Sequence, residues 1–318
     1  MSYSISYHEL LTTDWPEEIF IEDGILSRGD TMLVGCESKG GKTTLLNDIR
    51  RALISGGSFL GFKVVRPLKV LSLQSEIREG WLKKRLLPTY NGMNESFLKN
   101  SRTWATRNKI IFGRDSSKIA EECKEFKPDI LEIDPMINFH KYNENNATDM
   151  ANFFRDVDLI KDDFNLSVIM AQHFKKANTD PKVKTSLLDM IRGSTSMRGW
   201  ASTTIAMESR TPTEYRELAI ETRNSDEMIK RIIKYNKETK SFDWHNPVSI
   251  IGAWTVKYLS NTNGDLPTTE EFIKAMLNSH GDLLSHNRHK AFDIKNILSN
   301  TRVIKNIPKG KFNFISIY

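Results

Sequence analysis

At 318 residues the chain is long enough for one large domain and a smaller one, and its composition, 39% hydrophobic and 27% charged, is that of a globular protein. No apolar stretch approaches the roughly 20 residues of a membrane-spanning helix, so no membrane partner is expected. The net charge is +6, and basic residues gather at 174–192 and 286–318, which favours a nucleic-acid partner, although such clusters are also common on solvated surfaces.

The cysteines and the N-terminus indicate where the protein acts. Cys36 and Cys123 have neither the spacing of a disulfide framework nor that of a zinc site. The first residues lack the basic and apolar regions of a signal peptide. A reduced, cytoplasmic location is therefore expected.

Residues 1–29 are expected to form a lead-in segment that packs on the core. A phosphate-binding loop follows, because Thr31–Val34 suits a buried strand, Thr44–Arg50 suits a helix, and a glycine-rich turn ending in Gly-Lys-Thr joins them. Glycines let backbone N–H groups close on phosphate oxygens, and a helix N-terminus favours negative charge. The expected nucleotide-binding residues here are Gly35, Lys39, Gly40, Gly41, Lys42, Thr43 and Thr44. Lys42 would reach the β- and γ-phosphates, and the Thr43 hydroxyl would hold Mg²⁺.

The loop departs from the strict motif in its length. The spacing from Gly35 to Gly41 is one residue longer than the motif has, unless Cys36 takes the place of the first glycine. A glycine-rich turn that binds no phosphate is the alternative interpretation. The order of strand, Gly-Gly-Lys-Thr and helix favours the phosphate loop.

Short apolar runs separated by helical stretches predict an α/β core with a twisted, mostly parallel sheet over residues 30–245. The clearest expected strands are Met32–Val34, Val70–Leu73, Ile110–Phe112, Ile130–Ile133 and Val168–Ala171, and the expected helices include Ser117–Phe126 and Thr148–Phe164. Three later runs are expected to extend the sheet as antiparallel strands, namely Thr203–Met207, Leu218–Ile220 and Ile229–Tyr235.

Polar side chains follow three of these strands and suit ATP hydrolysis. Glu76 can orient or deprotonate the attacking water. Asp134 occupies the position of the Mg²⁺-associated acid of phosphate-loop enzymes. His173, which follows Gln172, can sense the γ-phosphate and pass its state to the next loop. A surface glutamate and a hydrogen-bonded structural histidine are the alternatives for Glu76 and His173.

Residues 246–318 predict a small winged helix-turn-helix domain. Val248–Ser260, a capped helix from Thr268 and Asn287–Leu298 supply three helices, and a basic hairpin with a Pro-Lys-Gly turn follows over 302–317. The residues expected to contact duplex DNA from this domain are Arg288, Lys290, Lys295, Lys309 and Lys311. A protein-docking role for the domain stays open.

The order of the motifs resembles the RepA-like branch of the RecA-type ATPases, whose best-known member is a hexameric replicative DNA helicase. The resemblance covers roughly residues 15–244. Its most specific segments are Ile133-Asp134-Pro135-Met136, Glu144-Asn145, Gln172-His173 and Arg192-Gly193-Ser194-Thr195-Ser196-Met197-Arg198-Gly199. Gln172 stands where the family has the first of two histidines.

The resemblance implies a RecA-like fold, ATP and Mg²⁺ as cofactors, and a role for each matching residue. Lys42 and Thr43 match the phosphate-loop pair, Glu76 the catalytic glutamate, Asp134 the magnesium-associated aspartate and His173 the position that couples nucleotide to DNA. Arg85 matches an arginine that supports the nucleotide site. Arg223 matches the arginine finger that acts on a neighbouring subunit's ATP, with an ordinary hairpin arginine as the alternative.

In RecA-type rings the loop that corresponds to the one after His173 faces the central channel. The resemblance therefore implies that four lysines of this loop contact single-stranded DNA, namely Lys175, Lys176, Lys182 and Lys184. A solvent-exposed loop without a ligand is the alternative. The sequence thus predicts an ATP-hydrolysing, ring-forming DNA helicase of the RepA-like type, a homo-hexamer that acts in DNA replication. A filament-forming recombination or repair ATPase and an ATP-dependent DNA-binding regulator that is not a motor remain as alternatives.

Overall fold

The computed structural model describes residues 4–105, 110–174, 187–190, 195–209, 215–225, 228–244, 254–255, 258 and 269–280. The chain divides into two compact units. The first comprises residues 1–208, 218–230 and 237–241, and the second comprises residues 209–217, 231–236 and 242–318. The domain boundaries at 29 and 245 stay a prediction.

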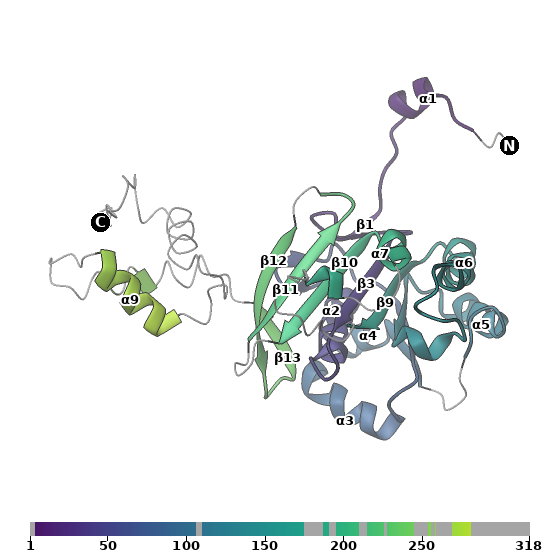
Figure 1. The fold of residues 1–318 in the computed structure, drawn as a ribbon. Coiled ribbons are helices and arrows are strands. Elements are labelled where there is room, and N and C mark those ends of the chain that lie inside the picture. Colours follow the sequence, from purple (N-terminus) through teal and green to yellow (C-terminus); the bar gives the residue numbers. More distant parts are fainter. Residues whose placement is uncertain are drawn as a thin grey trace. The chain divides into compact units, whose positions relative to one another are not determined.

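A nine-stranded sheet runs through the described residues (Figure 1). Its strands are β3 (Thr31–Cys36), β6 (Val70–Gln74), β7 (Ser101–Ala105), β8 (Ile130–Asp134), β9 (Ser167–His173), β10 (Thr203–Ser209), β11 (Tyr215–Thr222), β12 (Ile229–Asn236) and β13 (Ser241–Trp244). Their order across the sheet is β13-β12-β11-β10-β3-β9-β8-β6-β7. Consecutive strands of the chain are often not neighbours, so helical crossovers must connect them.

Every pairing from β10 to β7 is parallel, which confirms the predicted mostly parallel sheet. The antiparallel direction expected for Thr203–Met207 is wrong, because Thr203 pairs in parallel with Met32 of β3. A short apolar run carries no signal for its direction. The direction is set by the helix before it, α7 (Thr195–Trp200), which belongs to the crossover that a parallel pairing needs.

Helices cover both faces of the parallel part of the sheet. They are α2 (Lys42–Ser55), α3 (Glu79–Tyr90), α4 (Glu95–Leu98), α5 (Ser116–Phe126) and α6 (Ala147–Asp163), with two short 3-10 turns at Met136–Phe139 and Leu188–Met190. The predicted helices at 117–126 and 148–164 are confirmed to within a residue at each end. In the described part of the chain, no helix has both the length and the apolar character that crossing a bilayer requires.

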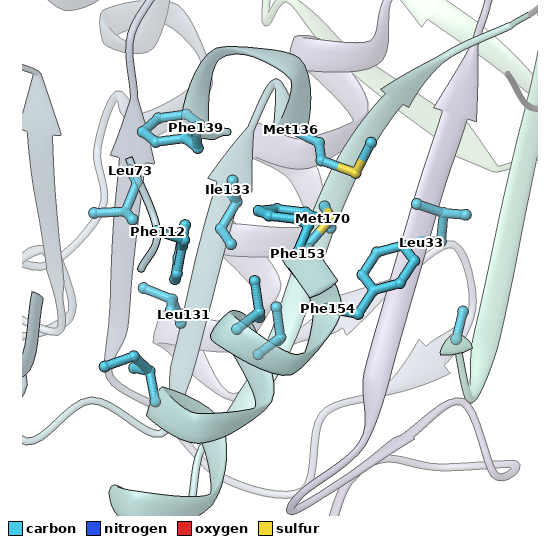
Figure 2. Packing of buried hydrophobic residues seen from close by; sticks show 14 of the residues in the cluster. Leu33, Leu73, Phe112, Leu131, Ile133, Met136, Phe139, Phe153, Phe154 and Met170 are labelled. Carbon is cyan, nitrogen blue, oxygen red and sulfur yellow. The ribbon is translucent and has the colours of Figure 1, made fainter. Parts of the chain in front are cut away.

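The two faces of the sheet carry different side chains, because residues two apart on a strand share a face. Leu131 and Ile133 belong to one buried cluster with residues of α5 and α6. Figure 2 shows Phe153 of α6 beside Ile133 and Met170 in this cluster. Glu132, between them on β8, instead bonds to a side chain of α2 on the opposite face. The α2 face is the one on which the predicted phosphate loop lies.

The predicted strand at Ile110–Phe112 is wrong. The edge strand is β7, which ends at Ala105. Phe112 lies in a turn, and its backbone N–H donates to the carbonyl oxygen of Phe139. The Phe112 ring meets Phe153 edge-on, with centroids 5.8 Å apart. This run is buried by side-chain packing rather than by sheet pairing, and an apolar run alone does not distinguish the two.

The second half of the lead-in segment packs on the core. Strands β1 (Ile19–Ile21) and β2 (Leu26–Ser27) form a small antiparallel pair, and Phe20 is fully buried. Glu18 bonds to Arg28, which also reaches Asp129 at 2.7 Å. A further antiparallel pair is formed by β4 (Ser58–Phe59) and β5 (Phe62–Lys63). Helix α1 (Tyr7–Thr12), by contrast, has no buried residue.

In the second unit, helix α9 (Thr269–His280) matches the helix predicted from the capping box at Thr268. Phe272 and Met276 are buried, and the Phe272 ring packs against Trp254 with centroids 5.6 Å apart. The predicted helix at 287–298 and the hairpin at 302–317 lie outside the described residues, as does most of the helix at 248–260. The winged helix therefore stays a prediction.

Candidate functional site

The predicted phosphate loop lies between β3 and α2. Gly35 is inside the strand, β3 ends at Cys36 and α2 begins at Lys42, so the turn itself is residues 37–41. Gly41, which caps the helix, has φ 107°, a value that favours glycine. At Gly40 a Cβ would lie 2.8 Å from Cγ of Glu37, so a side chain there would force a shift. The turn thus has the tight, glycine-dependent backbone that a phosphate-binding loop needs. Two further residues that are expected to bind the nucleotide also lie here, Lys39 within the turn and Thr44 in the first turn of α2.

Lys42, Thr43, Asp134 and His173 meet at the carboxyl end of the strands. Nζ of Lys42 is 3.5 Å from Oδ1 of Asp134 and 3.4 Å from Nε2 of His173. The Thr43 hydroxyl donates to Oδ2 of Asp134 at 3.4 Å. Parallel strands end at the same edge of a sheet, which brings together side chains far apart in sequence.

Asp134 is a buried acid whose Oδ1 faces the ammonium group of Lys42. Burial raises its pKa, while the charge of Lys42 lowers it and that of Glu76 raises it. Its Oδ1 accepts no hydrogen bond, and the Thr43 hydroxyl lies beside its other oxygen. These are the hard oxygen ligands that Mg²⁺ prefers, so the pair fits a magnesium ion. Within the described ranges no group of three His, Cys, Asp or Glu side chains could hold a metal ion, so phosphate oxygens and water would complete the coordination.

His173 faces the same site from β9. Burial lowers its pKa, and the charge of Lys42 lowers it further, so the imidazole is neutral near pH 7. Its Nδ1 is buried without a hydrogen-bond partner. The ring can therefore gain one more polar contact when a ligand binds.

Glu76 lies two residues beyond the end of β6 and is exposed. Its negative charge is among the causes that raise the pKa values of Asp134 and His173. Arg85 is exposed on α3, and among the described residues no ion pair joins it to Asp134.

Arg223 lies directly after β11, beside a cavity of about 470 Å³. Its Nη2 donates to the carbonyl oxygen of Gly199. On the same cavity wall, Nη2 of Arg198 is 2.6 Å from Oε2 of Glu221. Two arginines thus line an exposed cavity in the first unit.

The predicted DNA-contacting residues all lie outside the described residues. They are Lys175, Lys176, Lys182 and Lys184 after β9, and Arg288, Lys290, Lys295, Lys309 and Lys311 in the C-terminal part.

The sequence reasoning missed a buried polar cluster beneath this site. Nε of Arg50 donates to Oε2 of Glu132 at 3.1 Å, and both side chains are buried. A signal for it was present in the sequence, because Glu132 interrupts an otherwise apolar strand, and a buried carboxylate needs a partner.

Comparisons with known proteins agree with this architecture. No curated protein matches the chain. The solved ATPase domain of G40P is 14% identical with a TM-score of 0.53, over 69% of this chain and 86% of that chain. A DnaB-like replicative helicase, solved to show its interactions with primase, is also 14% identical with a TM-score of 0.53, over 74% of this chain and 66% of that chain. These similarities show a shared fold. Residues 7–179, more than half of the chain, match the family AAA_25, described as AAA domain, and the chain therefore belongs to the AAA domain family.

Proposed function

We propose that the chain is an ATP-hydrolysing, ring-forming DNA helicase or translocase of the RepA-like type that acts in DNA replication. The observation that carries this proposal is the meeting of Lys42, Asp134 and His173 beside the glycine-dependent turn. A lysine and a buried acid at this position are what a nucleoside triphosphate with its magnesium ion requires. The family and the shared fold support an ATPase.

The roles of the residues follow from their positions. The backbone of the 37–41 turn and the N-terminus of α2 would bind the phosphates, and Lys42 would reach the transferred phosphoryl group. Thr43 and Asp134 would hold the magnesium ion, which supplies charge stabilisation to the phosphoryl group. Glu76, which is exposed after the end of β6, would orient the attacking water and accept its proton.

Assembly into a ring would complete the site. Arg223 and Arg198 line the same cavity. Arg223 would stabilise negative charge on the ATP bound by the next subunit. Single-stranded DNA would follow the lysines of 175–184 through the channel. His173 precedes that loop directly, so it would link nucleotide state to DNA contact.

Three measurements test the proposal. The expected results are ATP hydrolysis stimulated by single-stranded DNA, ATP-dependent displacement of a strand from a forked duplex, and a closed hexamer in electron micrographs with a non-hydrolysable ATP analogue. Helical filaments would favour a recombination ATPase instead. Hydrolysis without strand displacement or movement on DNA would favour a DNA-binding regulator.

A further inference from the structure

A buried ion pair joins α2 to β8 beneath the nucleotide site. The guanidinium of Arg50 bonds to both carboxylate oxygens of Glu132, and the fully buried Ser72 connects to both partners. Nη2 of Arg50 donates to the Ser72 hydroxyl at 3.1 Å, and that hydroxyl donates to Oε1 of Glu132 at 3.0 Å. Glu132 has no exposed surface, and Arg50 is 5% exposed where it lines a cavity beside α3.

The same helix and strand carry the residues of the nucleotide site. Arg50 follows Lys42 by about two turns of α2. Glu132 precedes Asp134 by two residues on β8, so the two carboxylates share a face of the sheet. Ser72 and Glu132 are register partners on neighbouring strands. The ion pair therefore lies directly behind the contact between Lys42 and Asp134.

A second helix, α3, is attached to the same cluster. Nη1 of Arg50 donates to Oδ1 of Asn47 at 3.4 Å, and the hydroxyl of Tyr90 on α3 donates to the backbone carbonyl oxygen of Asn47 at 3.2 Å. Helix α3 begins three residues after Glu76. The cluster thus contacts α2, β8, β6 and α3, the elements that carry or flank Lys42, Asp134 and Glu76.

We propose that Arg50 is a positioning residue for hydrolysis, which rests on the proposed ATPase function. Its forked bond to Glu132 fixes α2 against β8 and so fixes Lys42 and Thr43 relative to Asp134. Stability alone does not account for the pair, because burying two charges costs desolvation that an apolar pair of similar volume avoids. What an apolar pair cannot supply is the fixed angle and distance of a two-pronged guanidinium–carboxylate contact.

The test replaces both partners, Arg50→Met with Glu132→Leu, so that no buried charge is left alone. The dissociation constant for ATP, measured by binding of a fluorescent analogue, is expected to stay near that of the wild type, and the thermal midpoint to fall by only a few degrees, because the buried Ser72 hydroxyl loses both partners. The kcat is expected to fall about 10- to 100-fold, because small misplacements of reacting groups cost this much. The Mg²⁺ concentration for half-maximal rate is expected to rise about tenfold or more, since Thr43 and Asp134 no longer hold a fixed spacing.

A conservative variant and a control complete the design. Arg50→Lys keeps the charge but loses the fork, so its kcat should lie between wild type and double variant. Arg102→Met removes an ion pair with Glu122 and Glu125 at the far edge of the sheet and should leave kcat and Mg²⁺ dependence unchanged.

Wild-type kcat and Mg²⁺ dependence in the double variant would overturn the proposal. If the double variant does not fold, Arg50→Lys decides, and wild-type values there would overturn it as well. A wild-type chain that binds no ATP would overturn the proposed function, a result separate from any difference between variants.

Discussion

Gln172 and His173 are consecutive residues at the end of β9, yet their side chains make contacts on opposite faces of the sheet. Nε2 of Gln172 donates to Oε1 of Glu144 at 3.0 Å, whereas Nε2 of His173 lies 3.4 Å from Nζ of Lys42. Because successive strand residues alternate in direction, any shift of this strand end moves both contacts together. A shift at the Lys42 side would therefore also reach the contact between Gln172 and Glu144.

His173→Gln is therefore expected to separate hydrolysis from its response to DNA. Glutamine keeps a polar group near Lys42, so ATP affinity should change little, while stimulation of the ATPase by single-stranded DNA should largely disappear. The measurement is the ATPase rate with and without oligonucleotide. Full stimulation in the variant would show that His173 has only a structural role.

Lys42→Ala is expected to weaken ATP binding and to lower the hydrolysis rate about 100-fold or more, because a group that neutralises developing phosphoryl charge is lost. Equilibrium binding and a phosphate-release assay measure the two effects. Lys63→Ala, at an exposed site on β5, is the matched control and should behave as wild type. Near-normal turnover in Lys42→Ala would contradict the phosphate-loop interpretation.

Glu76→Gln is expected to bind ATP with Mg²⁺ normally but to hydrolyse it about 10²- to 10⁴-fold more slowly. The substitution keeps size and removes the charge that would accept the proton of water. Binding and single-turnover hydrolysis should be measured on the same preparation. If affinity collapses while the remaining bound ATP turns over normally, Glu76 supports the fold rather than the chemistry.

Arg223→Ala is expected to bind ATP but to lose about 10³-fold of the ATPase rate, as removal of an arginine finger does. Mixing it with Glu76→Gln subunits should restore part of the activity, because each variant supplies the half-site that the other lacks. Gain on mixing is the measurement that separates action across an interface from action within one chain. Full activity of a wild-type monomer at high dilution would exclude the interface.

Acid should destabilise the fold through His140. Burial lowers the pKa of this histidine, and its Nε2 has no hydrogen-bond partner. The unfolded chain then binds this proton more readily than the folded one, so the contribution of His140 to stability is present above the ordinary histidine pKa of about 6.5 and declines as the pH falls below it. Urea unfolding at pH 7.5 and pH 5.5 should show a smaller decline for His140→Gln than for wild type. An equal decline in the free energy of unfolding for both proteins would show that His140 does not cause the loss of stability in acid.

The parallel core and the strand-end site residues could be predicted because each leaves a local pattern. Asp134 ends an apolar strand, and Lys42 follows two glycines between a strand and a helix, so the sequence predicts where each lies in the fold. The edge strand was missed because Ser101–Ala105 is polar, whereas the more apolar 110–112 run is buried by Phe139 and Phe153. The sequence pattern reports burial, and burial has several causes.

The Arg50–Glu132 pair illustrates what sequence patterns do not carry. A glutamate in an apolar strand signals that a partner exists, but the partner comes from a helix 82 residues earlier. Arg50 and Glu132 meet only because α2 packs against the face of β8 on which Glu132 lies. The parallel direction of β10 was not predicted for the same reason, because the direction of a strand depends on where the preceding crossover returns the chain to the sheet.

The strand order has a consequence for how the protein is made. β3 lies in the middle of the sheet, but Thr31 pairs with Val168, and Met32 pairs with Thr203, both far later in the chain. At a synthesis rate of about 5–20 residues per second, the apolar residues of β3 would wait roughly 10 to 30 seconds for their neighbours to emerge. Long-range parallel pairing is slow and leaves such strands open to aggregation in the meantime. Slower growth at low temperature, or extra chaperone that shields residues 31–36, should therefore raise the soluble yield of this chain more than any change at its surface.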